Sequence, residues 1–477
     1  MIKKYKLSKY VKRFDRAGYT CFFNGLTMKK TYALKSFVDS ILKSRNACFI
    51  KGSNKNIDKL IKEHFLVAPG EDKKLFGSIK KTTGKIRVSN IVMLVSNDCN
   101  YACSYCQIEE NMQDRQKKFN MTLDTAKKAL DLFEKNSKKE DKKTISVTGG
   151  EPFLNFETVK YIIERAKTIP NTRVILFTNG SLITKGIADY LQKNKSLVLV
   201  SLDGPKKIHD DVRINKTGKG TFNDSLRGFN LLRESGFKCG ISAVTGKHNK
   251  KRMNEVTKFF LELDPRSIGL NFGHYLLGKE NPTVIKMEDF ADMLIPFYKG
   301  MREKNIFVEN ISRFITPFYQ ERPLLNECQA QGRGFTVDSR GKLGVCKSLL
   351  VSDDISKSID KVKESIADEP VFKKWAKRSP FNMKECADCE IIGVCGGGCT
   401  YDSFAINKGD IFKIDKRLCG YTERVLEFLI WDLFDEIKDN IGDGFYLPSQ
   451  DIQEKKFLKY YDSSNELQRS VGHEKDR

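Results

Sequence analysis

The sequence predicts an α/β protein whose parallel sheet is covered by helices on its outer face. Between residues 91 and 274, six apolar strand-like runs alternate with helical patterns, which is typical of parallel sheets. Thirteen cysteines, ten of them in two patterned groups, and a basic N-terminal segment add further regions to the 477 residues. The expected regions are a basic α+β domain at 1–85, the α/β core at 86–274, a bridge at 275–327, a cysteine-rich domain at 328–440 and a polar tail at 441–477.

The basic N-terminal domain is expected to hold short strands followed by helices. Alternating apolar residues indicate the strands, and Asn24-Gly25 is a turn signal between the second and the third. Apolar residues at helical spacing indicate the helices. The predicted strands span 10–14, 19–23 and 26–34, and the predicted helices span 34–42 and 57–65.

The net charge indicates which partners the chain favours, and the hydropathy indicates whether it contains a membrane span. The net charge is +23, and residues 1–85 hold 21 basic and 6 acidic residues. Such a segment favours an acidic peptide or nucleic acid, although solvated lysine faces explain the charge equally well. With a mean hydropathy of -0.45 and no long apolar run, we expect no membrane span or secretory signal and a cytoplasmic location.

The core is expected to contain six strands and five intervening helices. In parallel sheets the chemistry lies at the carboxyl ends of the strands, and three polar or glycine-rich segments stand at such ends. These are Gly149-Gly150-Glu151-Pro152, Asn179-Gly180-Ser181 and Ser201 to Pro205. The strands are predicted at 91–96, 144–148, 174–178, 197–201, 239–244 and 267–272, and the helices at 122–136, 155–167, 183–194, 221–235 and 249–263.

Three cysteines follow the first of these strands in the pattern CxxxCxxC. Cys99, Cys103 and Cys106 stand on one short segment, and soft thiolates of this kind suit an iron–sulfur cluster better than a hard cation. Three ligands leave one iron of a 4Fe–4S cluster without a protein ligand. A cofactor or a substrate can therefore bind at that iron.

This spacing resembles that of radical S-adenosylmethionine (SAM) enzymes. The resemblance implies a partial (β/α)6 barrel, a cluster whose open iron chelates SAM, and electron transfer that releases a 5′-deoxyadenosyl radical. It also implies that the GGEP segment binds the amino group of SAM, that Ser201 and Arg213 bind its carboxylate, and that Tyr105 packs beside its adenine. The residues expected to contact SAM are Tyr105, Gly149, Gly150, Glu151, Pro152, Ser201 and Arg213.

A second cysteine group lies between residues 328 and 419. Its seven thiols exceed the needs of one metal, so at least two sites are expected. The spacing, together with Gly341, resembles the SPASM extension of peptide-modifying radical SAM enzymes, and this resemblance implies two auxiliary clusters and three 4Fe–4S clusters in all. The implied ligand sets are Cys386, Cys389, Cys395 and Cys419 for one cluster, and Cys328, Cys346 and Cys399 for the other.

The second set has one ligand too few for a 4Fe–4S cluster. The open iron can be ligated by one of four groups: a substrate thiolate, a water molecule, a non-cysteine side chain or a stray thiol such as Cys239. A structural zinc site over residues 386–419 is the competing interpretation. Cys21, Cys48 and Cys239 belong to neither group and are expected to be small buried hydrophobes.

The function most consistent with these features is that of a radical SAM maturase acting on a ribosomally made precursor peptide, by thioether or other crosslink formation. The strand and helix order of residues 1–85 resembles a winged-helix leader-recognition domain, in which an edge strand captures the leader. An electron donor such as flavodoxin or ferredoxin is the further expected partner. No residue is assigned as the catalytic base.

Two alternatives remain at this level. Residues 201–249 look like those of anaerobic sulfatase-maturating enzymes, which oxidise cysteine or serine to formylglycine, but these enzymes carry an aspartate where this chain has Lys347. A nucleic-acid-modifying enzyme is disfavoured, because the basic segment carries no recognised RNA-binding motif. Beyond the core, helices are expected at 287–301 and 425–437, and the polar residues from about 448 onward are expected to fray.

Overall fold

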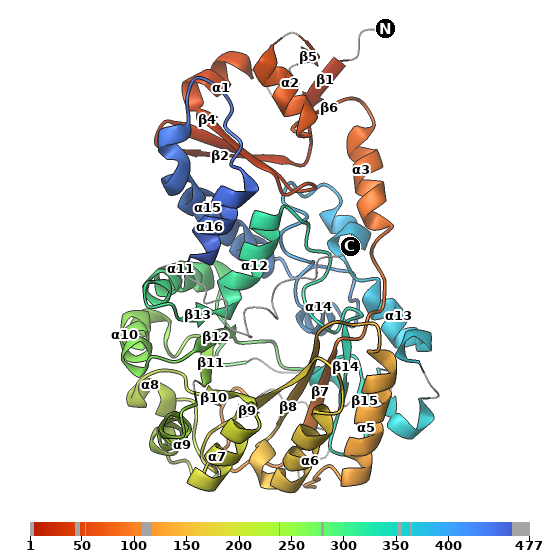
Figure 1. Cartoon of the computed structure of the whole chain (residues 1–477), viewed down its shortest axis with the longest axis vertical. Helices are drawn as coiled ribbons and strands as arrows, with labels where there is room; N and C mark the ends of the chain where they lie inside the picture. Colours follow the sequence, from red (N-terminus) through yellow and green to blue (C-terminus); the bar gives the residue numbers. More distant parts are fainter. Residues whose placement is uncertain are drawn as a thin grey trace.

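The computed structural model describes residues 4–42, 48–52, 54–106, 117–237, 239–277, 281–350, 355–362 and 365–459. The molecule is elongated, with the α/β core at one end and the N-terminal segments at the other (Figure 1). The C-terminal helices lie between these two ends.

Six parallel strands form the centre of the core sheet, as the sequence predicts. They are neighbours in the sheet in the same order as in the chain. Because all six strands run parallel, their carboxyl ends lie at one edge of the sheet. The strands are β7 (Asn90–Ser96), β8 (Lys143–Gly149), β9 (Thr172–Thr178), β10 (Leu197–Ser201), β11 (Gly240–Thr245) and β12 (Ser267–Phe272).

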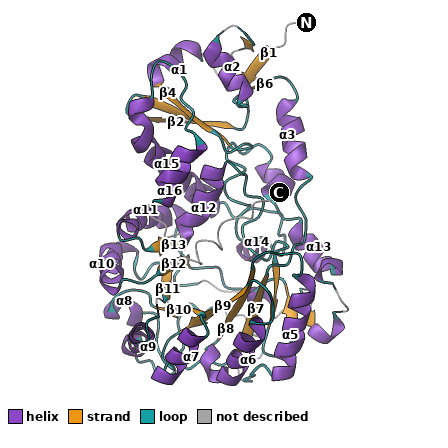
Figure 2. Ribbon diagram, in the orientation of Figure 1, coloured by secondary structure: helices purple, strands orange, loops and turns teal. Residues whose placement is uncertain are grey.

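Helices cover the outer face of this sheet (Figure 2). In the first of them, Ala126, Ala129, Leu130 and Phe133 are buried at helical spacing, so one apolar stripe packs against the strands. The Thr122 hydroxyl accepts a hydrogen bond from the Thr125 amide at 3.1 Å and caps this helix. The helices are α5 (Leu123–Asn136), α6 (Phe156–Ala166), α7 (Lys185–Lys193), α8 (Lys206–Asp210), α9 (Phe222–Glu234) and α10 (Met253–Leu263).

The same sheet extends into the regions expected to be separate. At one edge β13 (Phe307–Val308) pairs with β12, and at the other β14 (Gly334–Val337) pairs with β7, both in parallel. β15 (Lys342–Gly344) and β16 (Ser356–Ser358) continue from β14 in antiparallel pairing. The predicted helix at 287–301 is confirmed as α11 (Met287–Glu303), and α12 (Glu309–Gln320) follows β13.

The described residues of the N-terminal region form two small sheets and three helices. In the described residues one sheet has the order β5-β1-β6 and the other has the order β2-β3-β4. The three strands of the second sheet fall on the predicted segments. The elements are β1 (Lys4–Leu7), β2 (Val11–Arg16), β3 (Tyr19–Asn24), β4 (Lys30–Leu34), α1 (Lys35–Ile41), β5 (Phe49–Ile50), α2 (Lys55–Lys62), β6 (Leu66–Val67) and α3 (Glu71–Lys80).

The β2-β3-β4 sheet is buried on both faces. Cys21 and Phe23 point into the main core of the chain, whereas Phe22 joins a smaller core with α1 and α2. Because side chains alternate across a strand, one sheet contributes to both cores. At its edge, Tyr32 forms an isolated antiparallel bridge with Tyr446, and its hydroxyl donates to the Ile430 carbonyl at 2.8 Å. The N-terminal region is thus tied to the C-terminal one.

The C-terminal part is helical around the second cysteine group. The predicted helix at 425–437 begins earlier, as α15 (Arg417–Ile437), so Cys419 lies in its first turn. The expectation that the chain frays from residue 448 is wrong for α16 (Gln450–Leu458), in which Phe457 and Gln453 are buried. Residues 460–477 of the predicted tail lie outside the described residues. The other helices are α13 (Pro370–Ala376) and α14 (Thr400–Ile406). Among the described helices, none is long and apolar enough to cross a membrane.

The packing of α16 gives a stability test. Phe457 is 2% exposed and meets Phe318 edge to face at 5.5 Å between ring centroids. We expect Phe457→Ala to lower the free energy of unfolding by about 3–5 kcal/mol, because it empties a buried aromatic site. The matched control is Leu458→Ala, since Leu458 is 37% exposed, and its expected cost is about 0.5 kcal/mol. If chemical denaturation shows that the two variants lose equal free energies of unfolding, α16 does not pack as described.

Candidate active site

The CxxxCxxC segment begins three residues after the end of β7 and is held by the backbone. Ala102 donates to the Ile214 carbonyl at 2.7 Å, and Ser104 donates to the Val212 carbonyl at 3.0 Å. Tyr101 also forms an isolated antiparallel bridge with Asn215. These bonds fix the loop that carries Cys99, Cys103 and Cys106 at the carboxyl edge of the sheet.

The glycines of the GGEP segment lie directly against this cysteine loop. The Gly150 amide donates to the Ser96 carbonyl and the Glu151 amide to the Asp98 carbonyl, each at 2.8 Å. A Cβ atom on Gly149 would stand 2.2 Å from the Ser96 carbonyl oxygen, and one on Gly150 would stand 2.2 Å from that of Asp98. Side chains at either position are therefore excluded by the backbone that leads into Cys99.

Glu151 is placed differently from the sequence expectation. Its carboxylate is 0% exposed and accepts hydrogen bonds from the Thr178 hydroxyl at 2.7 Å, the Asn179 amide at 2.8 Å and the Phe153 amide at 3.2 Å. Burial raises its pKa to about 7, and these bonds lower it in part. The side chain therefore joins the ends of β8 and β9.

A second buried carboxylate joins the other expected SAM contacts. Asp203 Oδ2 accepts from the Tyr105 hydroxyl at 2.6 Å and from Arg213 Nε at 2.9 Å, while its Oδ1 accepts from the Val244 amide at 2.8 Å. Arg213 Nη1 lies 3.9 Å from the Cys103 sulfur. Burial opposes ionisation of Asp203, but the Arg213 guanidinium holds its pKa below the usual value. Asp203 thus positions Tyr105 and Arg213 beside the cysteine loop.

The comparisons with known proteins fit this geometry. Residues 93–260 match the sequence model of the Radical SAM superfamily. The chain carries a radical SAM domain. A radical SAM cyclopropyl synthase, TigE of Paramaledivibacter caminithermalis, is 25% identical over 72% of this chain and 74% of its own. A serine-type anaerobic sulfatase-maturating enzyme of Bacteroides thetaiotaomicron is 32% identical over 35% of this chain and 41% of its own.

Solved structures share the fold beyond the radical SAM domain. Native anSMEcpe with bound AdoMet superposes with a TM-score of 0.62 at 22% identity, over 74% of this chain and 100% of its own. Streptococcus suis SuiB bound to the precursor peptide SuiA gives a TM-score of 0.55 at 16% identity, over 87% of this chain and 99% of its own. The likeness to SuiB thus extends over most of the chain.

The thiols of the radical SAM domain fit a metal cluster by their burial and their grouping. Burial, with a smaller contribution from the neighbouring thiols, raises the pKa of Cys99 and of Cys103 to about 12. Thiols in this state are protonated at neutral pH, and metal ligation requires their thiolates. A bound metal would add positive charge to that of the Arg213 guanidinium beside Cys103. The radical SAM superfamily implies a 4Fe–4S cluster that binds SAM.

Thiols of the second cysteine group are buried and electrostatically coupled to one another. Electrostatic coupling raises the pKa of Cys386 through Cys389 and Cys419, and that of Cys395 through all three of these thiols. Cys328 is coupled in the same way to Cys346, and Cys399 is coupled to Cys328. Of the thiols coupled to Cys386, Cys395 lies in the turn before α14 and Cys419 lies in the first turn of α15. Burial is the main cause of the raised pKa in each case.

A buried arginine missed at the level of the sequence lies between these two sets. Arg378 is 0% exposed and donates to the Ile411 carbonyl at 2.5 Å, the Gly398 carbonyl at 2.8 Å and the Ser403 hydroxyl at 2.7 Å. Burial lowers its pKa, and thiols of both sets oppose this. Arg378 therefore fixes the loop before α14 and brings positive charge to both cysteine sets.

One cavity of about 760 Å³ connects the radical SAM domain to the second cysteine group. Its lining includes Tyr105, Cys106, Ser201 and Arg213 of the radical SAM domain. It also includes Cys328, Cys346 and Cys399 of the second cysteine group. This volume lies within the range of about 300–1,000 Å³ of pockets for small ligands. Reactive groups from two cysteine sites therefore face a shared space.

The glycine contact with the cysteine loop gives the test of this site. Gly150→Ala places a methyl group against the Asp98 carbonyl, so we expect the reconstituted variant to lose about four irons per chain and its SAM cleavage. Gly186→Ala is the control, because no atom lies within 4 Å of a Cβ on Gly186 in α7. Its iron content and activity should stay unchanged. Full iron loading and normal SAM cleavage in Gly150→Ala would contradict the contact.

Proposed function

We propose that this protein is a radical SAM maturase that crosslinks a ribosomally made precursor peptide. The cavity that joins Cys106 to Cys328, Cys346 and Cys399 is the observation that carries this proposal. A peptide side chain in this space is within reach of both the residues expected to bind SAM and these three thiols. The match to SuiB, whose structure holds a precursor peptide, supports the same class of substrate.

The proposed residues divide the work between the radical SAM domain and the second cysteine group. The radical cluster is held by Cys99, Cys103 and Cys106. SAM is held by the backbone of 149–152 and by the side chains of Ser201 and Arg213. Asp203 positions Tyr105 and Arg213. When bound, the clusters supply the electron that cleaves SAM and take up the electron left on the substrate. The remaining cysteines hold two auxiliary clusters, in the sets Cys328, Cys346, Cys399 and Cys386, Cys389, Cys395, Cys419. Flavodoxin or ferredoxin is the proposed donor.

The proposed crosslink is an oxidation of the peptide. A carbon–hydrogen bond and a thiol S–H bond break, and a carbon–sulfur bond forms. One hydrogen atom leaves with 5′-deoxyadenosine, the thiol proton leaves to solvent, and one electron leaves to the auxiliary site. Lys347 lines the cavity where sulfatase-maturating enzymes carry an aspartate base. This difference in charge favours the peptide crosslink over formylglycine formation.

Residues 1–85 are the proposed leader-binding region. Their excess of basic residues suits an acidic leader, and the described β5-β1-β6 sheet has β5 and β6 as its edges, where an extended peptide can add. Deleting residues 1–80 would not test this cleanly. The β2-β3-β4 sheet contributes Cys21, Phe23 and Tyr32 to the main core, so the deletion would also destabilise the rest of the chain.

The experiment uses the full chain, reconstituted anaerobically and supplied with SAM, dithionite and synthetic copies of short cysteine-containing peptides encoded in reading frames next to its gene. We expect one 5′-deoxyadenosine per crosslink and a peptide that has lost two hydrogen atoms, with the new bond placed by tandem mass spectrometry. A peptide shortened at its N-terminus should lose the crosslink while SAM cleavage continues. Conversion of a cysteine or serine to formylglycine instead would establish the sulfatase-type alternative. SAM cleavage with no change in any peptide would contradict the proposal.

A further inference from the structure

The three-thiol set of Cys328, Cys346 and Cys399, which lines the cavity, lacks a fourth cysteine in the described part of the chain. Cys239 precedes β11, at the opposite end of the strands from the cavity, and Cys21 is 0% exposed within β3. Cys48 is exposed, so the expectation that it is buried is wrong, and it lies next to β5 in the N-terminal region. None of these thiols can reach Cys328, Cys346 and Cys399, so another group has to complete the site.

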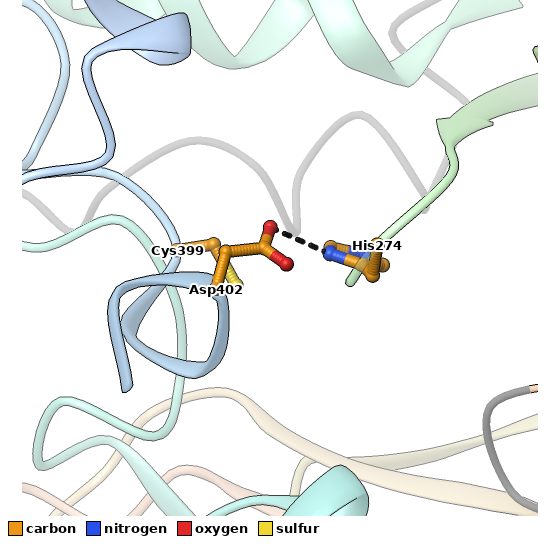
Figure 3. Close-up of side chains that lie close together, drawn as sticks. All are labelled: His274, Cys399 and Asp402. Carbon is orange, nitrogen blue, oxygen red and sulfur yellow. Dashed lines mark hydrogen bonds and ion pairs between the residues drawn. The ribbon is translucent and has the colours of Figure 1, made fainter. Parts of the chain in front are cut away.

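An imidazole stands beside this set. His274 follows the carboxyl end of β12 and lines the cavity with Cys399 and Cys346. The ligand atoms of His274, Cys399 and Asp402 all lie within 4.8 Å of one another. Figure 3 shows the His274 ring, which comes from the strand end, facing Cys399 and Asp402 at the start of α14. His274 and Cys399 thus meet from two different elements.

The His274 ring is held in a fixed orientation. Its Nδ1 lies 2.9 Å from Asp402 Oδ2, and Asp402 Oδ1 accepts from the Tyr275 amide at 3.1 Å. The Asp402 carboxylate is 0% exposed and also lies 3.7 Å from Arg417 Nη2. Histidines that ligate metals commonly donate their other ring nitrogen to such a carboxylate, which sets the tautomer and the ring direction. With Nδ1 bound to Asp402, Nε2 is the nitrogen left for a metal.

Aromatic packing and the backbone add to this orientation. The rings of Phe272 and Tyr401 lie 4.9 Å and 6.3 Å from the His274 ring, centroid to centroid. Asn281 donates to the His274 carbonyl at 2.8 Å, and the Tyr401 hydroxyl donates to the Tyr275 carbonyl at 2.7 Å. The imidazole is therefore positioned before any metal binds, and little conformational entropy is lost on ligation.

We propose that His274 is the fourth protein ligand of the auxiliary cluster held by Cys328, Cys346 and Cys399. Imidazole is a known replacement for thiolate in iron–sulfur centres, where it raises the reduction potential. Asp402 is the positioning residue, because it holds the ring through Nδ1. The proposal rests on the iron–sulfur assignment of this set within the proposed function, and it holds whichever peptide is the substrate. A substrate thiolate that binds this cluster has to displace a neutral ligand.

The test measures nitrogen coupling to the reduced auxiliary cluster. The protein is the full chain with Cys99, Cys103 and Cys106 changed to alanine, which removes the radical cluster, and it is labelled with ¹⁵N-histidine and reduced with dithionite. Pulsed electron paramagnetic resonance should show a strong ¹⁵N coupling. In His274→Cys the coupling should vanish while the iron content is retained, because a thiolate replaces the imidazole. His209→Gln is the matched control, since His209 lies beside Asp203 in the radical SAM domain, and it should leave the coupling unchanged.

A variant at the positioning residue separates ligation from simple packing. Asp402→Asn should keep the ¹⁵N coupling and shift the reduction potential of this cluster, because the neutral amide no longer makes the ring nitrogen more basic. A cluster at this set without histidine coupling would overturn the proposal for His274 and leave the proposed function intact. If the chain with Cys99, Cys103 and Cys106 changed to alanine gives no paramagnetic signal from a cluster at Cys328, Cys346 and Cys399, the cluster assignment is overturned as well. The crosslink assay would then decide the function separately.

Discussion

The contact between two glycines and the loop that carries the first three cysteines is the constraint on which the site depends. Gly149 and Gly150 lie so close to Ser96 and Asp98 that a Cβ on either glycine would stand 2.2 Å from a carbonyl oxygen. The contact joins the ends of β7 and β8 through backbone bonds. Glu151 then joins β8 to β9, and Asp203 joins the end of β10 to Tyr105, Arg213 and β11. Each strand end is thus fixed by its neighbour.

This chain of contacts explains why the chemistry can be concentrated at one edge. Parallel strands in sequential order bring all their carboxyl ends together, and the buried carboxylates replace water as partners for the amides there. Ionised or hydrogen-bonded groups in such a site are stable only when every partner is present. Burial raises the pKa of the cysteine thiols in both groups, so a metal that binds their thiolates has to offset this cost.

Much of the fold could be predicted from the sequence because its signals are local. Apolar runs predicted β7 to β12, and helical periodicity predicted α5, α6, α7, α9 and α10. The metal sites that the cysteine spacings indicate stay predictions. The features that were missed depend on tertiary contacts. The polar α16 is stabilised by Phe457 packing on Phe318, β13 and β14 join the core sheet from distant segments, and Arg378 is recognisable only from the loops around it. Glu151 was assigned to a ligand because its burial cannot be read from the motif.

His274 carried a signal that the same reasoning could have used. It follows β12 just as Ser201 ends β10, so the rule that chemistry lies at strand ends applies to it, and Asp402 stands one helical turn after Cys399. The missing information was that β12 and α14 meet at the cavity. His274, Asp402 and Cys399 thus form a cluster in which the side chains are held by hydrogen bonds, as they are in the radical SAM domain.

The central claim is that two iron–sulfur sites face one cavity in this chain. An iron-edge anomalous difference map from crystals of the anaerobically reconstituted chain with SAM tests it most directly. The account predicts separate iron peaks at Cys99, Cys103 and Cys106 and at Cys328, Cys346 and Cys399, both beside the same cavity, with a third peak at the four-cysteine set. Iron at the first site alone, with zinc at the second cysteine group, would contradict it.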